Sequence, residues 1–349
     1  NALDRLVAHI SHAGIVAVDT EFIREKTYFP ELCLLQIATD EMIAAIDCQA
    51  SVDLDPLFDL LLAEGRTWLL HSARQDLEVL FNRTGRLPWG INDTQIAAGL
   101  TGMPLQIGLQ GMLEETIGVH LGKQHTRADW SRRPLSDAMK QYALDDVRYL
   151  RSASDWLDER LKALGRTSWL EEECRRQLAL PIEPDTAAIA DRIRGIGGLR
   201  GKQRDAAFAL VAWREQRARD RNKPRRWILA DEDLVRIARS DARTIDELAR
   251  AADIPARLLR HAGDEILATI RQAPPVEAAA DHQPPDRTTV KAIQAEVRRL
   301  AEAEGLAPEL LATRRDIAAL AGGRPTEPMV NGWRNALLSD LIEQFSQGR

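Results

Sequence analysis

The chain has few cysteines and no long apolar run, and each shortage excludes a class of protein. Only three of its 349 residues are cysteine. Cys33, Cys48 and Cys174 are too few and too scattered for the disulfide framework of a small secreted domain. We identify no signal peptide and no apolar stretch long enough to span a bilayer. We therefore expect a protein of a reducing cytoplasm that does not associate with a membrane.

Two ligand-binding motifs of other proteins are incomplete in this chain. The glycine-rich segment 197–203 superficially matches a phosphate loop, but such a loop needs Gly at position 196 and Ser or Thr at position 203, where this chain has Ile196 and Gln203. A helicase built on that loop is excluded. His71, His120 and His125 have no Cys or His partners at zinc spacing, so we interpret them as structural or incidental.

The first part of the chain has the pattern of a mixed α/β domain. The total length exceeds what one compact core usually holds and suggests two or three domains. Four short apolar runs have the composition of strands: Ile15 to Glu21, Leu32 to Ile37, Met42 to Ile46 and Trp68 to Leu70. The first three follow one another closely, as in an antiparallel meander, and helical patterns follow later. We expect a mixed sheet flanked by helices.

Acidic residues lie at the ends of two of these runs. Asp19 and Glu21 are two positions apart on a strand, so their side chains project from the same face. Phe22 follows them and either stacks on a terminal base or packs beneath the sheet. Asp76 comes shortly after the run that ends at Leu70, where a helix is expected to begin. These carboxylates can therefore face one crevice.

A third acidic motif is expected on a helix. Ser136 is a plausible N-cap, and Tyr142 and Asp146 lie four positions apart on the helix that follows, so they share a face. Asp93 precedes another expected helix, where it either caps that helix or supports the acidic site from outside. The sequence leaves these two roles of Asp93 open.

The acidic residues as a set indicate a metal site. Single Asp and Glu residues at strand ends and helix starts are common as caps and solvated charges. Carboxylates gathered without lysine or arginine repel one another, and hard divalent cations relieve this by accepting oxygen ligands. Two such ions about 4 Å apart can activate a water, hold a scissile phosphate and stabilise the departing 3′ oxygen. The ordered set therefore predicts phosphodiester hydrolysis.

Five segments together resemble the ribonuclease D family, which belongs to the DEDD exonucleases and to their subclass with tyrosine in the third motif. The segments are VDTEF, HSARQDLEVL, NDTQIAA, TRADWSRRPLS and YALDDVRYL. The resemblance covers residues from about 14 to 155. It implies a ribonuclease H-like 3′-5′ exonuclease fold, in agreement with the mixed sheet expected from the apolar runs.

The resemblance also implies a role for each of five residues. It makes Asp19, Glu21, Asp76 and Asp146 the ligands of two divalent metal ions, Mg²⁺ or Mn²⁺, and it makes Tyr142 the group that orients the attacking water. An unperturbed phenol has a pKa near ~10 and is a poor general base at neutral pH. We therefore expect Tyr142 to position a metal-bound water by hydrogen bonding rather than to abstract a proton.

The implied function is a 3′-to-5′ exoribonuclease that releases nucleoside 5′-monophosphates from RNA 3′ ends, with tRNA precursors as substrates and a monomer as the active form. The direction of digestion rests on the family. A DNA-directed 3′-5′ exonuclease would use the same five residues, because the 2′-hydroxyl is what separates RNA from DNA. A non-catalytic RNA-binding scaffold is the third hypothesis. Helical modules after the first domain favour RNA.

Composition divides the chain into five segments. We expect a 3′-5′ exonuclease domain at 1–165, a linker with bridging helices at 166–198, an HRDC domain at 199–272, a linker at 273–287 and a second HRDC-like helical domain at 288–349. The second linker is rich in Pro and Ala, which is typical of a spacer without a packed core. The HRDC prediction rests on resemblance to the helical module that ribonuclease D shares with certain DNA helicases.

Positive charge is concentrated in the expected HRDC domain. The formal net charge is −6, yet the segment 199–229 has ten Lys or Arg against three Asp or Glu. We predict that Arg217, Arg219 and Arg221 bind the phosphate backbone, with Trp213 and Trp227 near enough for base stacking.

Two further basic residues lie close to the acidic motifs. Lys123 and Arg127 belong to a charged segment between the second and third motifs, and we predict that they contact substrate phosphates. A charged surface loop is also normal in proteins that bind no ligand. The choice between these two interpretations depends on where the fold brings this segment.

Overall fold

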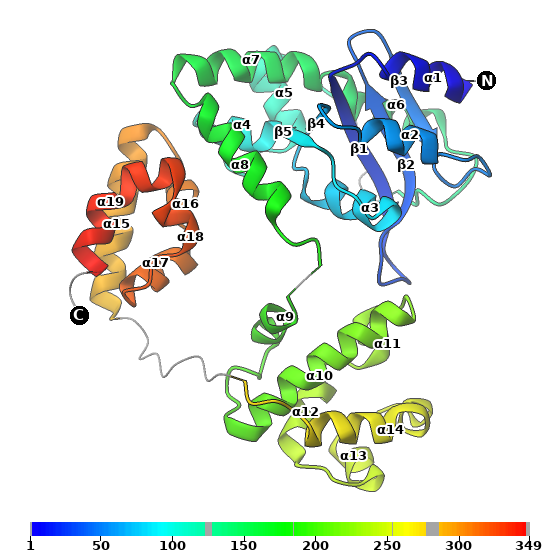
Figure 1. Ribbon diagram of the computed structural model, residues 1–349, viewed down its shortest axis with the longest axis vertical. Helices are drawn as coiled ribbons and strands as arrows, with labels where there is room; N and C mark the ends of the chain where they lie inside the picture. Colours follow the sequence, from blue (N-terminus) through cyan, green and yellow to red (C-terminus); the bar gives the residue numbers. More distant parts are fainter. Residues whose placement is uncertain (1, 123–127, 184, 253, 277–285, 347–349) are drawn as a thin grey trace. The chain divides into compact units, whose positions relative to one another are not determined.

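The computed structural model describes residues 2–122, 128–183, 185–252, 254–276 and 286–346 (Figure 1). The chain forms two compact units. One comprises the described parts of residues 1–23, 32–180 and 282–349, and the other comprises residues 24–31 with the described parts of 181–281. Among the helices described, none is long and apolar enough to cross a membrane.

A five-stranded mixed sheet forms the centre of the first unit, with strand order β3-β2-β1-β4-β5. The strands are β1 (Ile15–Ile23), β2 (Glu31–Ala38), β3 (Ile43–Asp47), β4 (Thr67–Leu70) and β5 (Gly90–Asp93). β4 is parallel to both β1 and β5, whereas β2 and β3 are antiparallel. The predicted mixed sheet is confirmed, but β5 was not predicted, because its four residues, GIND, contain a single apolar side chain.

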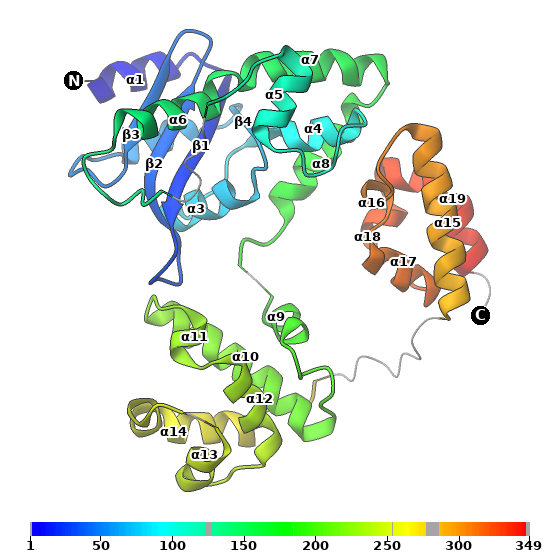
Figure 2. The same cartoon turned by 180° about the vertical axis from the view of Figure 1, so that it is seen from behind.

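Helices cover both faces of this sheet. Figure 1 and Figure 2 show α6 (Asp137–Arg148) across one face and α2 (Asp55–Leu61) on the other. Burial on both sides explains the apolar run of the central strand β1, where Val16 and Val18 are buried. The other helices of this part are α1 (Ala2–Ile10), α3 (Arg74–Thr84), α4 (Thr94–Leu100), α5 (Leu109–Ile117), α7 (Leu150–Ala163) and α8 (Thr167–Ala179).

The starts of α3 and α6 agree with the sequence prediction. Ser136 caps α6, because its hydroxyl accepts a hydrogen bond from the backbone N–H of Met139. Asp76 lies in the first turn of α3, directly after β4. The local signals for these two helix starts were therefore sufficient to orient Tyr142, Asp146 and Asp76 on their elements.

The second unit is helical apart from the loop 24–31 that joins it. Its helices are α9 (Thr186–Arg192), α10 (Gly201–Asp220), α11 (Arg225–Ile228), α12 (Asp231–Ser240), α13 (Ile245–Ala251) and α14 (Ala256–Arg271). Leu210 and Val211 of α10 pack in one apolar core with Leu234 of α12 and Ile266 of α14. α13 and α14 approach closely, since a Cβ on Gly263 would lie 2.4 Å from Cδ1 of Ile245. Of the predicted linker 273–287, residues 277–285 lie outside the described residues.

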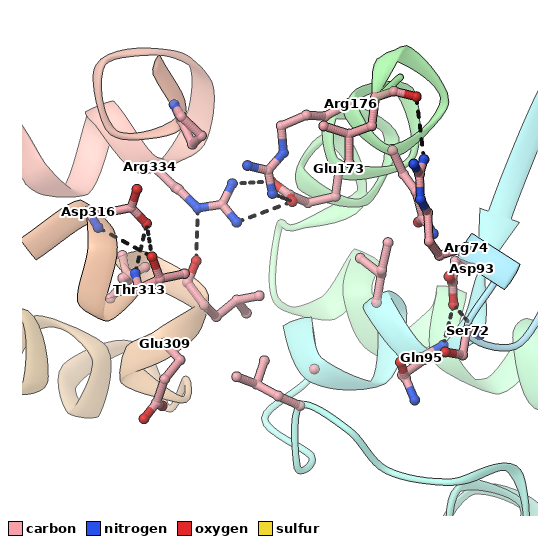
Figure 3. A pocket seen from close by; sticks show the side chains of 18 residues that line it. Ser72, Arg74, Asp93, Gln95, Glu173, Arg176, Glu309, Thr313, Asp316 and Arg334 are labelled. Atoms are coloured by element: carbon pink, nitrogen blue, oxygen red, sulfur yellow. Dashed lines mark hydrogen bonds and ion pairs between the residues drawn. The ribbon is translucent and has the colours of Figure 1, made fainter. Parts of the chain in front are cut away.

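The C-terminal helices belong to the first unit and pack on α8. They are α15 (Arg287–Glu304), α16 (Pro308–Leu311), α17 (Arg314–Ala321), α18 (Glu327–Val330) and α19 (Gly332–Ser346). The ring of Trp333 stacks on Trp169 of α8 with centroids 4.5 Å apart. Figure 3 shows the Glu173 carboxylate of α8 paired with the guanidinium of Arg334. The predicted all-helical C-terminal part is confirmed, and its assignment as a second HRDC-like domain stays a prediction.

Candidate active site

Three carboxylates from two distant parts of the sequence meet at one point. Asp19 and Glu21 project from β1, and Asp146 projects from α6. One ligand oxygen from each lies within 4.8 Å of the others. With Tyr142 and Phe22 they line a pocket of about 500 Å³. The geometry therefore offers a cation several oxygen ligands in one pocket.

Asp76 lies beside this group but faces a different partner. It is buried, with 7% of its surface exposed, and its Oδ1 accepts a 2.6 Å hydrogen bond from the hydroxyl of Thr20. The charge of Asp76 is close enough to help raise the pKa of Glu21. Asp76 is therefore part of the same electrostatic cluster, although it is not one of the three carboxylates whose oxygens converge.

The cluster is electrostatically unfavourable when all its members are ionised. Burial, followed by the charge of Asp146, raises the pKa of Asp19 to about 8. Burial and the neighbouring carboxylates raise the pKa of Glu21 to about 9. Burial and the charges of Asp145 and Asp76 raise the pKa of Asp146 to about 7. A divalent cation would reduce this repulsion, and carboxylate oxygens are among the ligands that Mg²⁺ and Mn²⁺ prefer.

Tyr142 lies one turn before Asp146 on α6, and its hydroxyl hydrogen-bonds to the Asp146 carboxylate. Burial and the surrounding carboxylates raise the pKa of Tyr142 above its ordinary value. The phenol therefore stays protonated at neutral pH and does not act as a base; its proton is donated to Asp146, and its oxygen can still accept a hydrogen bond. This is the state that a water-orienting role requires.

Asp93 has the capping role, one of the two that the sequence left open; its support of the acidic site stays a prediction. It caps α4, because its Oδ1 accepts a hydrogen bond of 2.9 Å from the backbone N–H of Gln95. The same carboxylate accepts hydrogen bonds from the backbone N–H of Ser72 at 3.0 Å (Figure 3) and from that of Ala73 at 2.8 Å. Ser72 has φ of 63°, which is unusual for a residue with a side chain. Asp93 thus holds the strained turn that begins α3 and carries Asp76.

His71 was interpreted from sequence as structural or incidental, yet it lines the acidic pocket. Its Nε2 lies 3.0 Å from the carbonyl oxygen of Ile107 and its Nδ1 lies 2.9 Å from the Thr94 hydroxyl. Burial lowers its pKa, so the ring is neutral at pH 7. No local signal predicts this position, because it follows from the parallel pairing of β1 and β4: Ala17 lies opposite Leu69, which brings His71 level with Asp19.

Gln75 and Trp130 also line the pocket, and neither was singled out from the sequence. Trp130 follows the second motif by more than fifty positions, so only the tertiary fold brings it to the site. Phe22 lines the pocket and is half-buried, which is compatible with both of its predicted roles. Lys123, His125 and Arg127 lie outside the described residues.

The three predicted phosphate-binding arginines belong to the second unit. Nη1 of Arg217 pairs with Glu265 at 2.5 Å, and Nη1 of Arg219 pairs with Glu183 at 3.1 Å. Only 12% of the Arg217 side chain and 22% of the Arg219 side chain are exposed. Arg221 is exposed. The positive charge of Arg217 and Arg219 is therefore largely compensated within the protein.

The two tryptophans beside this basic segment have different environments. Trp213 packs against the apolar core of the second unit and is partly buried. Trp227 is 60% exposed, and Nζ of Lys223 lies 5.8 Å from the centroid of its ring. The exposed cations Lys223 and Arg226 flank this ring in the sequence. Of the two, Trp227 is the one that can stack on a base without unfolding the core.

Comparison with known proteins identifies two domains. A family model described as 3′-5′ exonuclease matches residues 1–162, and a model of the HRDC domain matches residues 203–270. The structure matches the crystal structure of Escherichia coli RNase D, described as an exoribonuclease involved in structured RNA processing, with a TM-score of 0.86. The two sequences are 30% identical, and the match covers 99% of this chain and 96% of that one.

Relatives in other bacteria match over nearly the whole chain. Ribonuclease D of Bartonella henselae is 32% identical, with 99% of this chain and 88% of the relative covered. Ribonuclease D of Xanthomonas oryzae is 35% identical, with 97% of this chain and 94% of the relative covered. The acidic pocket, the mixed sheet and these matches agree. The chain therefore belongs to the ribonuclease D family.

Proposed function

We propose that this protein is a metal-dependent 3′-to-5′ exoribonuclease in which Asp19, Glu21, Asp76 and Asp146 hold two divalent ions, Mg²⁺ or Mn²⁺. Membership of the ribonuclease D family makes the chain a 3′-5′ exoribonuclease; the assignment of roles to residues is the proposal. The observation that supports it best is the convergence of three carboxylate oxygens within 4.8 Å in a pocket where burial opposes their ionisation. Such a site gains from a bound cation.

Each side chain has a defined task in this proposal. Bound ions would hold the scissile phosphate, lower the pKa of the attacking water and neutralise charge on the departing 3′ oxygen. The carboxylates of Asp19, Glu21, Asp146 and Asp76 would hold them, and the hydroxyl of Thr20 fixes the Asp76 carboxylate by a hydrogen bond. The Tyr142 hydroxyl donates its proton to Asp146, and its oxygen accepts a hydrogen bond from the attacking water and so fixes the direction of that water. Phe22 contacts the terminal base or ribose at the wall of the pocket.

The second unit supplies affinity for the RNA backbone. Arg217, Arg219 and Arg221 add to the positive potential of α10 and its end, and the exposed charge there belongs to Arg221 with its neighbour Lys223. Cations bind phosphate by releasing counterions from the nucleic acid, and this term carries no sequence information. Trp227 adds base stacking, which is also tolerant of sequence. Lys123 and Arg127 extend this role to the segment between the second and third motifs.

The physiological substrates are RNA 3′ ends, with tRNA precursors as the main class. This part of the proposal rests on the family. Its support is the near-complete coverage of ribonuclease D relatives and the similarity to Escherichia coli RNase D, an exoribonuclease involved in structured RNA processing. We propose a cytoplasmic monomer on the same ground. Nucleoside 5′-monophosphates are the expected products.

A 5′-labelled RNA with a single-stranded 3′ extension tests this function. The labelled RNA and its DNA counterpart are incubated with the protein, with and without Mn²⁺, and the products are separated at single-nucleotide spacing. A ladder that shortens from the 3′ end on RNA, only with Mn²⁺, is the expected result. Asp137→Asn is the matched control for a substitution in the acidic site. Asp137 lies on α6 with its side chain 99% exposed, so this substitution should leave the ladder unchanged.

Two other outcomes would favour the rival functions. Equal or faster digestion of DNA would indicate a DNA-directed exonuclease that uses the same carboxylates. Binding of RNA without any cleavage, at every Mn²⁺ concentration, would indicate a non-catalytic scaffold. The carboxylate cluster favours the enzyme, because buried acidic groups with raised pKa values are costly for a protein that only binds RNA.

A further inference from the structure

Arg133 uses every hydrogen-bond donor of its guanidinium. Nε donates a bond of 2.7 Å to Oδ2 of Asp47, and Nη2 donates a bond of 2.7 Å to Oδ1 of the same carboxylate. Nη1 donates to the carbonyl oxygens of Trp130 at 2.7 Å and Arg132 at 2.8 Å. Nη2 donates a further bond of 3.1 Å to the carbonyl oxygen of Cys33. A guanidinium has five N–H donors, so none is left for water or RNA.

These five bonds join three parts of the first unit. Cys33 belongs to β2, Asp47 ends β3, and Trp130 and Arg132 belong to the segment that leads into α6. The hydrogen bonds from Arg133 lower the pKa of Asp47, as expected for a bidentate pair. We call Arg133 and Asp47 together the Arg133 clamp. The clamp fixes the backbone of the segment 130–133 to the sheet edge formed by β2 and β3.

The clamp determines where Trp130 lies. Trp130 is only 2% exposed and packs with Cys33 of β2, Ala143 of α6 and Tyr142. Its indole N–H is buried without a hydrogen-bond partner in the described structure. No polar contact of the ring itself therefore fixes its position, which depends on packing and on the anchored backbone. A buried indole N–H without a partner destabilises the folded state, so the anchored backbone is needed to keep the Trp130 ring in this position.

Trp130 in turn forms the wall behind Tyr142. The two ring centroids are 6.1 Å apart with planes tilted by 32°, and both residues line the acidic pocket. Moving the Trp130 backbone would open space into which the Tyr142 ring can turn, away from Asp146. A displacement of about 1 Å in a reacting geometry can cost roughly 10²-fold in rate. The position of the Tyr142 ring therefore affects the reaction rate.

We infer that the Arg133 clamp is a positioning device for Tyr142: it holds Trp130 against the Tyr142 ring and so keeps the hydroxyl beside Asp146. The inference rests on the proposed role of Tyr142 as the group that orients the water. Arg133 is a positioning residue, since all five of its donors are bound within the protein. It has no part in binding RNA or metal, so its loss should change turnover and leave substrate affinity alone.

A double-mutant cycle with the full-length protein tests this. Arg133→Lys keeps the charge but replaces the planar five-donor fork by one ammonium that cannot reach the same acceptors. We expect it to lower kcat about 10-fold to 100-fold and to change KM less than about twofold. In a Tyr142→Phe background the same substitution should lower kcat less than about twofold, because the group it positions is already gone.

Two further variants keep the test decisive. Asp47→Asn has nearly the same shape and weakens the clamp without removing Arg133, so it replaces Arg133→Lys if that variant does not fold. Arg86→Lys is the control, because Arg86 pairs with Asp59 on the surface of the same unit and lies outside the pocket. Its kcat and KM should match those of the unchanged protein in both the native and the Tyr142→Phe background.

The outcomes separate the inference from the function beneath it. If Tyr142→Phe lowers kcat and Arg133→Lys lowers it by the same factor in both backgrounds, the clamp does not act through Tyr142 and the inference is overturned. If Tyr142→Phe leaves kcat unchanged, the role of Tyr142 is wrong and the inference falls with it. A rise in KM with kcat unchanged would show that Arg133 serves RNA binding, which also overturns the inference.

Discussion

The hydroxyl of Thr20 on β1 donates a 2.6 Å hydrogen bond to Oδ1 of Asp76 on α3, although 56 positions separate the two residues. Thr20 lies between Asp19 and Glu21, so one strand presents two carboxylates and also orients a third from another element. Both Thr20 and Asp76 are buried. The bond therefore connects the strand that carries Asp19 and Glu21 to the helix that carries Asp76.

Thr20→Val should weaken metal binding without changing the fold. Valine has nearly the same shape but cannot donate, so Asp76 loses its orientation. Loss of such an outer partner typically lowers metal affinity about 10-fold to 100-fold. The Mn²⁺ concentration that gives half-maximal cleavage should rise by that factor, while Thr20→Ser, which keeps the donor, should behave like the unchanged protein. An unaltered Mn²⁺ dependence in Thr20→Val would contradict this role.

Asp93→Ala should destabilise the first unit more than the loss of an ordinary cap. An N-cap contributes about 1 kcal/mol, and leaving the buried N–H of Ala73 unpaired costs about 1–3 kcal/mol, so we expect a loss of about 2–4 kcal/mol. Asp286→Ala removes a cap of α15 alone and should cost about 1 kcal/mol. Thermal unfolding of both variants measures the difference. Equal shifts in Tm would show that Ser72 and Ala73 do not need Asp93.

Glu173→Ala should release the C-terminal helices from α8. The carboxylate accepts hydrogen bonds from Nε1 of Trp333 at 2.9 Å and from Arg334, whose side chain is 7% exposed. Removing one member of a buried ion pair typically costs about 3–5 kcal/mol, because the other charge stays buried and unpaired. Limited proteolysis should cut the variant faster between α14 and α15. Glu171→Ala on the exposed side of α8 is the control, and equal cleavage rates would refute the prediction.

The same contact predicts a dependence on pH. Burial raises the pKa of Glu173, but the hydrogen bond and charge of Arg334, aided by Arg176, outweigh it and leave the pKa below its usual value of 4.5. A lowered pKa means that the stabilisation is present above that value and is lost as pH falls below it. Proteolytic release of the C-terminal helices should therefore accelerate below pH 4.5 in the unchanged protein. In Glu173→Ala the rate should no longer change in that range.

Binding of RNA should separate into a charge term and a stacking term. Replacing Arg221, Lys223 and Arg226 by Ala should reduce the slope of log affinity against log salt by about 2, at about 0.7 for each phosphate that is no longer neutralised. Trp227→Ala should weaken binding by about 1–3 kcal/mol and leave that slope unchanged. Trp89→Ala is the control, since Trp89 is 61% exposed and belongs to the first unit. A slope that changes with Trp227 alone would contradict this division.

Local patterns were enough to predict the elements that carry the five motif residues. Side chains two positions apart on β1 share a face, which places Asp19 and Glu21 together. The cap at Ser136 fixes where α6 begins and so which residues of that helix share a face. Both features depend only on neighbours in the sequence. Contacts between distant segments were not predictable. The bonds from Thr20 to Asp76 and from Arg133 to Asp47 depend on strand register and on loop paths that no local signal encodes.

Exposure of charged side chains was the other quantity that the sequence did not reveal. Arg217 and Arg219 have the composition of a phosphate-binding face, and only the fold pairs them with Glu265 and Glu183. His71 was interpreted as structural or incidental for a related reason, since only the parallel pairing of β1 and β4 brings it level with Asp19. Both cases involve partners far away in the sequence. Tertiary pairing therefore determines which of the candidate residues face a ligand.

The most direct test of the account is the single-turnover cleavage rate of a 5′-labelled RNA by the unchanged protein and by Asp19→Asn, at saturating Mn²⁺. RNA binding is measured in the same samples. Because bound metals supply several kcal/mol of transition-state stabilisation, Asp19→Asn should cleave at least about 10²-fold more slowly while binding RNA with unchanged affinity. Cleavage by Asp19→Asn at a rate close to that of the unchanged protein would contradict the assignment of Asp19 to a two-metal site.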